Sequence, residues 1–121
     1  MKLIDIAHIK VQIYVDDVGP NQGAFAFVPG SHKADAGPYP QVGRVEHMPG
    51  HKVVPGKAGT AIIFNSYGWH TSMVNYSDEP RKSIILIYEK WTEGRVNANT
   101  FAALADRLQT PARRRLFSLE Q

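Results

Sequence analysis

The chain has 121 residues, of which 43% are hydrophobic and 21% charged, a balance typical of a soluble globular protein and not of a disordered or membrane protein. It contains no cysteine, which excludes disulfides, thiolate metal sites and cysteine nucleophiles together. The formal net charge is +3 at pH 7, and three arginines gather in the run 111–117. Such a run on a helix is more often a solvated face than a nucleic-acid surface, so we expect no nucleic-acid role.

The N-terminal stretch 1–15 is apolar, but Asp5, His8 and Lys10 interrupt it and no small-residue cleavage site follows. We therefore interpret it as a strand and not as a signal peptide. No apolar run approaches the roughly 20 residues that cross a bilayer. These features favour one modest domain in the cytoplasm, without a membrane partner.

Residues 8–17 alternate in character: the odd positions from Ile9 to Val15 are apolar, and the even positions from His8 to Asp16 are mostly polar. This pattern predicts a strand with its aliphatic face buried. Segment 18–23 is rich in turn residues, and 24–28 alternates small with aromatic residues. The two runs together predict a β-hairpin.

The region from Ala34 to Gly50 is rich in Gly and Pro and has no periodicity, which predicts a long and functional loop. Further short strands are expected at 51–54, 60–64, 69–75 and 83–91. Short strands with Gly and Pro turns at this spacing indicate a mainly β sandwich or barrel.

The pattern changes to helix after residue 97. Asn99 or Thr100 can cap a helix over 101–109, and Thr110 with Pro111 can begin a second one. We expect a β domain over 1–92 and a helical segment over 93–121 that packs on one barrel edge. The packing residues would be Leu104, Leu108, Leu116 and Phe117.

Three residues between 68 and 83 could carry chemistry. His70 follows a strand and could bind a divalent metal through a neutral imidazole. Arg81 offers a planar fork for a carboxylate, and Ser83 lies on the same face of the next strand. Taken singly, each residue type is more often structural.

Two further histidines, His47 and His51, have a spacing that suits a metal only on a helix, which Pro49 and Gly50 disfavour.

Two stretches, 11–33 and 53–89, occur in an order that resembles the C-terminal half of the phytanoyl-CoA dioxygenase family. The acidic pair, the Asn-x-Gly turn, the "PGSH" turn and the spacing from His70 to Arg81 carry this resemblance. It implies a double-stranded β-helix barrel of the jelly-roll or cupin-like type, incomplete here, and a dioxygenase dependent on Fe(II) and 2-oxoglutarate. By resemblance His70 is an iron ligand, Arg81 holds the far carboxylate of 2-oxoglutarate, and Ser83 is a second donor.

The family's His-x-Asp pair has no counterpart, because neither His-x-Asp nor His-x-Glu occurs in the chain. The chain could therefore be a shortened and inactive relative, or a second chain could complete the site. Alternatively, Asp5, His8, Asp16 or Asp17 could substitute as ligands. A missing barrel half leaves sheet edges unpaired, so we expect a homo-oligomer.

Two other functions stay open at this level. A cupin-type barrel would use Gly59 and His70, but Asn75 is one place off that family's second motif and the first motif is absent. A non-catalytic module could bind a small molecule behind the 34–50 loop.

Overall fold

The computed structural model describes residues 8–89, 101–117 and 119. The chain divides into two compact units, Met1–Glu89 and Lys90–Gln121. In the described ranges, no helix is long and apolar enough to cross a membrane.

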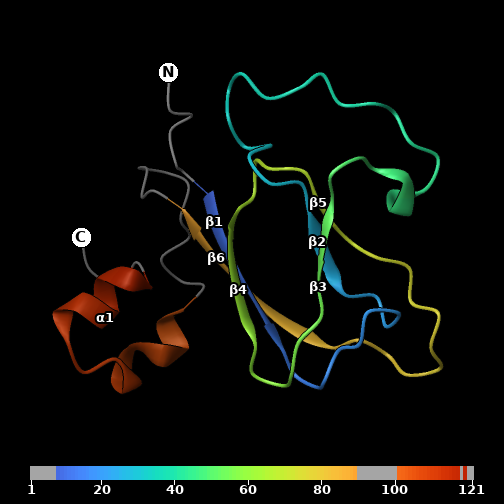
Figure 1. The fold of residues 1–121 in the computed structure, drawn as a ribbon. Coiled ribbons are helices and arrows are strands. Elements are labelled where there is room, and N and C mark those ends of the chain that lie inside the picture. Colours follow the sequence, from blue (N-terminus) through green and yellow to red (C-terminus); the bar gives the residue numbers. More distant parts are fainter. Residues whose placement is uncertain (1–7, 90–100, 118, 120–121) are drawn as a thin grey trace. The chain divides into compact units, whose positions relative to one another are not determined.

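Six strands build the first unit as two three-stranded antiparallel sheets (Figure 1). One sheet has the order β4-β1-β6 and the other the order β3-β2-β5. The strands are β1 (His8–Tyr14), β2 (Phe25–Phe27), β3 (Lys52–Val54), β4 (Ala61–Asn65), β5 (His70–Ser72) and β6 (Ser83–Glu89). A short 3-10 helix, η1 (Val45–His47), lies in the long loop between β2 and β3.

The predicted hairpin is wrong, because β1 and β2 lie in different sheets. β1 pairs with β4 and β6, whereas β2 pairs with β3 and β5. The connection after Tyr14 crosses between the sheets, and isolated bridges from Val18 to Gly56 and from Gln22 to Asn75 hold it. Turn-rich residues between two strands are common to hairpins and to such crossings, so local sequence did not distinguish them.

The buried face of β1 is the opposite of the predicted one. Tyr14 is 1% exposed and Gln12 is 4% exposed, whereas Ile9 and Ile13 are only partly buried. The predicted alternation is correct, but the interior of the unit lies on the even-numbered side. The reason is that both faces of this strand carry groups that can be buried, and a tyrosine is buried when its hydroxyl finds partners.

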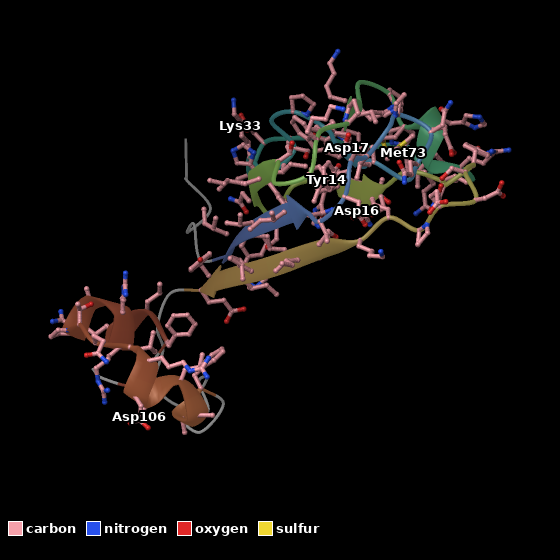
Figure 2. All side chains as sticks on the ribbon, turned by 90° about the horizontal axis from the view of Figure 1, so that it is seen from below. Tyr14, Asp16, Asp17, Lys33, Met73 and Asp106 are labelled. Carbon is pink, nitrogen blue, oxygen red and sulfur yellow. The ribbon has the colours of Figure 1, made fainter. Side chains whose placement is uncertain are left out.

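Tyr14 joins both sheets from the centre of the core. Its hydroxyl donates to the Val54 carbonyl at 2.7 Å and accepts from the Phe25 amide at 2.8 Å. The Phe25 ring in turn packs on Phe64 of β4, with centroids 4.6 Å apart. One side chain on β1 therefore satisfies backbone groups of β2 and β3. Figure 2 shows Tyr14 among the strands of this unit.

Asp17 anchors the turn that follows β1. Its carboxylate accepts from Lys57 Nζ at 2.7 Å and from the Ala58 amide at 2.9 Å. The Lys57 hydrogen bond, and next the Ala58 amide, hold the pKa of Asp17 below its usual value. A lowered carboxyl pKa stabilises the fold above the pKa of the unfolded chain, and the contribution is lost as pH falls through the folded-state pKa.

The melting temperature should therefore fall less steeply between about pH 5 and pH 3 in Asp17→Asn than in the wild type. Thermal melts followed by circular dichroism at several pH values measure this slope. Asp35→Asn, an exposed change in the long loop, should keep the wild-type slope. An unchanged slope in Asp17→Asn would contradict the assignment.

The second unit contains η2 (Ala102–Arg107), a 3-10 helix, and α1 (Pro111–Leu116). The predicted N-cap of α1 is confirmed: the Thr110 hydroxyl accepts from the Arg113 amide at 3.3 Å. The predicted α-helix over 101–109 is wrong: Ala102–Arg107 form a 3-10 helix, and the extended backbone of Thr110 before Pro111 separates it from α1. The proposed caps Asn99 and Thr100 lie outside the described residues, and the packing of this unit on the barrel stays a prediction.

Candidate functional site

His70 stands at the start of β5 with one ring nitrogen engaged. Its Nδ1 lies 2.7 Å from the Gly68 carbonyl, and since a carbonyl can only accept, Nδ1 donates. In the neutral imidazole this leaves the lone pair on Nε2, the arrangement found in metal-binding histidines whose other nitrogen is held by a backbone carbonyl. The ring packs on Phe64, with centroids 4.8 Å apart, which fixes its plane.

The "PGSH" turn supports the strand that carries His70. Ser31 Oγ accepts from the Trp69 amide at 2.7 Å, and the Val28 amide donates to the Trp69 carbonyl at 3.0 Å. A side chain at Gly68 would come within 3.1 Å of Ser31 Oγ, so this close approach favours glycine there. The turn therefore positions the backbone on either side of Trp69, directly before His70.

Arg81 is oriented by two serine hydroxyls from two strands. Its Nη1 donates to Ser83 Oγ at 3.0 Å, and its Nη2 donates to Ser72 Oγ at 2.7 Å. Each serine oxygen accepts from the guanidinium and keeps its own O–H available for an anion. Ser72 was not among the predicted site residues. The signal for it was its position two residues after His70, on the same face of a short strand.

The strand register brings the His70 imidazole to the same face of β5 as Ser72, which belongs to the arginine cluster of Arg81, Ser72 and Ser83. His70 is paired with Phe27 and Ser72 with Phe25, so both side chains lie on the side of β5 that faces the core. Two residues along a strand span about 6.6 Å. An anion held by Arg81 and Ser72 would therefore lie within the length of a small molecule from the His70 imidazole.

The other candidate ligands have different partners. His8 contacts Glu89 through Nε2 at 2.6 Å and the Ser66 hydroxyl through Nδ1. Asp16 pairs with Lys82 at 3.4 Å, and Asp17 with Lys57. Asp5 lies outside the described residues. Among the residues that the structure describes, no group of three or more His, Cys, Asp or Glu is placed to hold a metal.

The described strands thus place the His70 imidazole near the Arg81 guanidinium, and both lie next to open sheet edges. In the described part of the chain β5 pairs only with β2, and β6 only with β1. Every residue of Ile84–Tyr88 in β6 is apolar and between 39% and 54% exposed. An exposed apolar edge strand of this kind is a template for a further strand.

Comparison with known proteins decides the family. A family model described as phytanoyl-CoA dioxygenase (PhyH) matches residues 5–83. The chain belongs to the phytanoyl-CoA dioxygenase family. The predicted resemblance is confirmed, and so is the fold: a mainly β, incomplete double-stranded β-helix of the jelly-roll, cupin-like type.

Relatives of this dioxygenase-family chain are much longer than it is. A methylphosphonate hydroxylase from Gimesia maris is 28% identical over 99 residues, which cover 78% of this chain and 38% of that protein. The non-heme alpha ketoglutarate dependent epimerase SnoN is 28% identical, with a TM-score of 0.55 over 70% of this chain and 35% of SnoN.

HygX from Streptomyces hygroscopicus, solved with nickel and 2-oxoglutarate, has a TM-score of 0.58 at 22% identity. That match covers 69% of this chain and 36% of HygX, and it shows the shared fold alone. The chain thus spans less than two fifths of each of these three relatives.

Proposed function

We propose that this chain carries the 2-oxoglutarate clamp and one iron ligand of a dioxygenase-like site dependent on Fe(II) and 2-oxoglutarate. The observation that carries the proposal is the Arg81 guanidinium, which Ser83 of β6 and Ser72 of β5 hold, with Ser72 on the same face of β5 as His70. Membership of the family supports it, and so do the relatives that are described as dependent on or bound to this co-substrate.

In this proposal the guanidinium fork binds the far carboxylate of 2-oxoglutarate through parallel, charge-assisted hydrogen bonds. The two serine hydroxyls add neutral donors and keep the fork in place. His70 Nε2 would be one of three protein ligands to the iron. Because the described residues supply only that one, we derive no catalytic step from them.

We further propose that a second copy of the chain completes the site, which makes the functional unit a homo-oligomer with a small-molecule substrate. The open edges of β5 and β6 support this, because a strand added there would lie beside both His70 and Ser83. Chelation by several groups is what holds iron, so a single chain with one ligand should bind it poorly.

Anaerobic calorimetry with Fe(II) in the presence of 2-oxoglutarate tests the metal half of the site. His70→Ala should weaken iron binding by about tenfold or more, whereas His47→Ala, an exposed histidine in η1, should bind as the wild type does. Small-angle scattering on the same samples should show an oligomer. Equal binding by His70→Ala, or a clean monomer that still binds iron, would overturn the proposed arrangement.

A non-catalytic module that binds a small molecule is the second candidate. Two observations favour it: no three-ligand group occurs in the described part of the chain, and an apolar cavity lies behind the long loop. Iron binding that depends on His70 would exclude it.

A further inference from the structure

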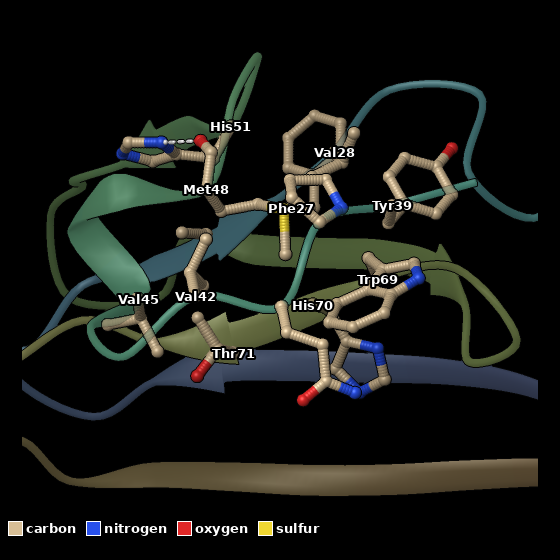
Figure 3. A pocket seen from close by; sticks show the side chains of 13 residues that line it. Phe27, Val28, Tyr39, Val42, Val45, Met48, His51, Trp69, His70 and Thr71 are labelled. Carbon is tan, nitrogen blue, oxygen red and sulfur yellow. Dashed lines mark hydrogen bonds between the residues drawn. The ribbon is translucent and has the colours of Figure 1, made fainter. Parts of the chain in front are cut away.

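An apolar cavity of about 400 Å³ lies between the long loop after β2 and the strands β2 and β5 (Figure 3). Ala26 and Thr71, which are paired across these strands, form its floor. Residues Val42, Val45 and Met48 of the loop line the opposite side. This volume is within the range of small-molecule sites.

The floor lies on the other sheet face from the arginine cluster. Side chains alternate along a strand, so Ala26 and Thr71 point away from the core-facing Phe25 and Ser72. His70 also lines the cavity, and it lines a second cavity of about 310 Å³ as well. Trp69 lines both as well.

The polar side chains of the described lining include Gln41, His51, His70 and Thr71, but no carboxylate, ammonium or guanidinium group. None of the described residues that line the cavity is Asp, Glu, Lys or Arg. Burying an ion without a counter-charge costs far more than burying a neutral ring, because the ion loses its hydration. The Tyr39 and Trp69 rings stand 5.6 Å apart at 48°, which gives the cavity an aromatic wall. Flat apolar molecules pack well against such rings.

Hydrogen bonds hold the loop in place over the cavity. The Tyr76 hydroxyl accepts from Arg44 Nη2 at 2.7 Å and donates to Glu46 Oε1 at 3.2 Å, on either side of Val45. The Tyr76 amide is itself fixed to the Asn21 carbonyl at 2.9 Å. Met48 is 7% exposed, so the loop carries its own apolar anchor. A preformed cavity binds without the entropy cost of ordering a loop.

We propose that this cavity binds an uncharged molecule with a flat, apolar ring system. All residues that line the cavity belong to the first unit, and binding there requires no metal. The role of that molecule as the substrate rests on the proposed function, because the cavity opens toward His70.

Two ring-matched probes test the binding. In the absence of metal and 2-oxoglutarate, the full chain should bind neutral 2-naphthol at least about tenfold more tightly than 2-naphthoate, which is an anion at pH 7. Protein NMR titration gives both affinities and shows which residues shift. Because no metal is present, this result is independent of the iron and 2-oxoglutarate measurements.

Matched valine variants locate the site. Val45→Asp puts a charge into the lining and should weaken 2-naphthol binding by about tenfold or more, whereas Val74→Asp, at an exposed valine outside the lining, should not. Tyr39→Ala removes part of the aromatic wall without touching a strand and should also weaken binding. Equal affinity for both probes, or equal loss in Val45→Asp and Val74→Asp, would overturn the proposal, since either result indicates unspecific adsorption to exposed apolar faces.

Discussion

Replacing Arg81 by alanine should weaken 2-oxoglutarate binding by about 30-fold to 1000-fold, which corresponds to roughly 2–4 kcal/mol. The reason is geometric as well as electrostatic. Ser72 and Ser83 hold both ends of the guanidinium, so its fork is oriented before the ligand arrives. Alanine leaves the two hydroxyls, which are neutral donors and cannot replace a bidentate cation. Anaerobic calorimetry with 2-oxoglutarate and Fe(II) measures the loss.

The neighbouring Lys82 provides the matched control. Lys82→Ala removes the same formal charge one residue away, from a side chain that is 63% exposed and paired with Asp16. Its effect should stay within about twofold, because exposed charges are screened. Arg81→Lys should fall between the two, since it keeps the charge and loses the fork. If Arg81→Ala binds like the wild type, or if Lys82→Ala loses as much, the clamp assignment is wrong.

Tyr14→Phe should destabilise the first unit by about 2–4 kcal/mol, although it removes a single oxygen atom. The hydroxyl satisfies the Val54 carbonyl and the Phe25 amide at the same time, and the ring is 1% exposed. Phenylalanine would leave the buried Phe25 amide and the partly buried Val54 carbonyl without this partner, and each unpaired buried group costs about 1–3 kcal/mol. Urea unfolding followed by circular dichroism gives the difference in free energy.

Tyr67→Phe is the corresponding control, because Tyr67 is 55% exposed in the turn before β5. It should unfold within about 0.5 kcal/mol of the wild type, as surface substitutions usually do. A Tyr14→Phe variant as stable as Tyr67→Phe would mean that water or a backbone shift satisfies the two groups, and the role assigned to Tyr14 would then be wrong.

The same tyrosine explains why the fold was predictable only in part. Alternation along residues 8–17 identified a strand, because alternation follows from the backbone geometry of any strand. It could not identify the partners, because β1 pairs with strands that begin at Ala61 and Ser83. Nor could it identify the interior side: Tyr14 is buried because two backbone groups from β2 and β3 meet its hydroxyl, and those groups are distant in sequence.

The candidate site, too, was predictable from the sequence only in part. His70, Arg81 and Ser83 were predicted from one continuous segment; in the structure His70 begins β5, Ser83 begins β6, and Arg81 lies two residues before β6. Whether they bind iron and 2-oxoglutarate stays a prediction. Ser72 was missed because its position two residues after His70 is a weak signal by itself, and its contact with Arg81, nine residues later, is seen only in the structure. Further ligands were not predicted, because neither His-x-Asp nor His-x-Glu occurs in the sequence.

The strand order also determines when the chain can fold. His8 is paired with Glu89, and Ile9 with both Tyr88 and Asn65, so β1 acquires its neighbours only after most of the first unit has been synthesised. Pairing of such distant segments is slow, because a long loop must close before any contact forms. During translation β1, with Ile9, Val11 and Ile13, therefore has no strand partner until β4 has been made, and its second partner, β6, comes later still. We expect this nascent segment to be a binding site for chaperones that recognise extended apolar chain.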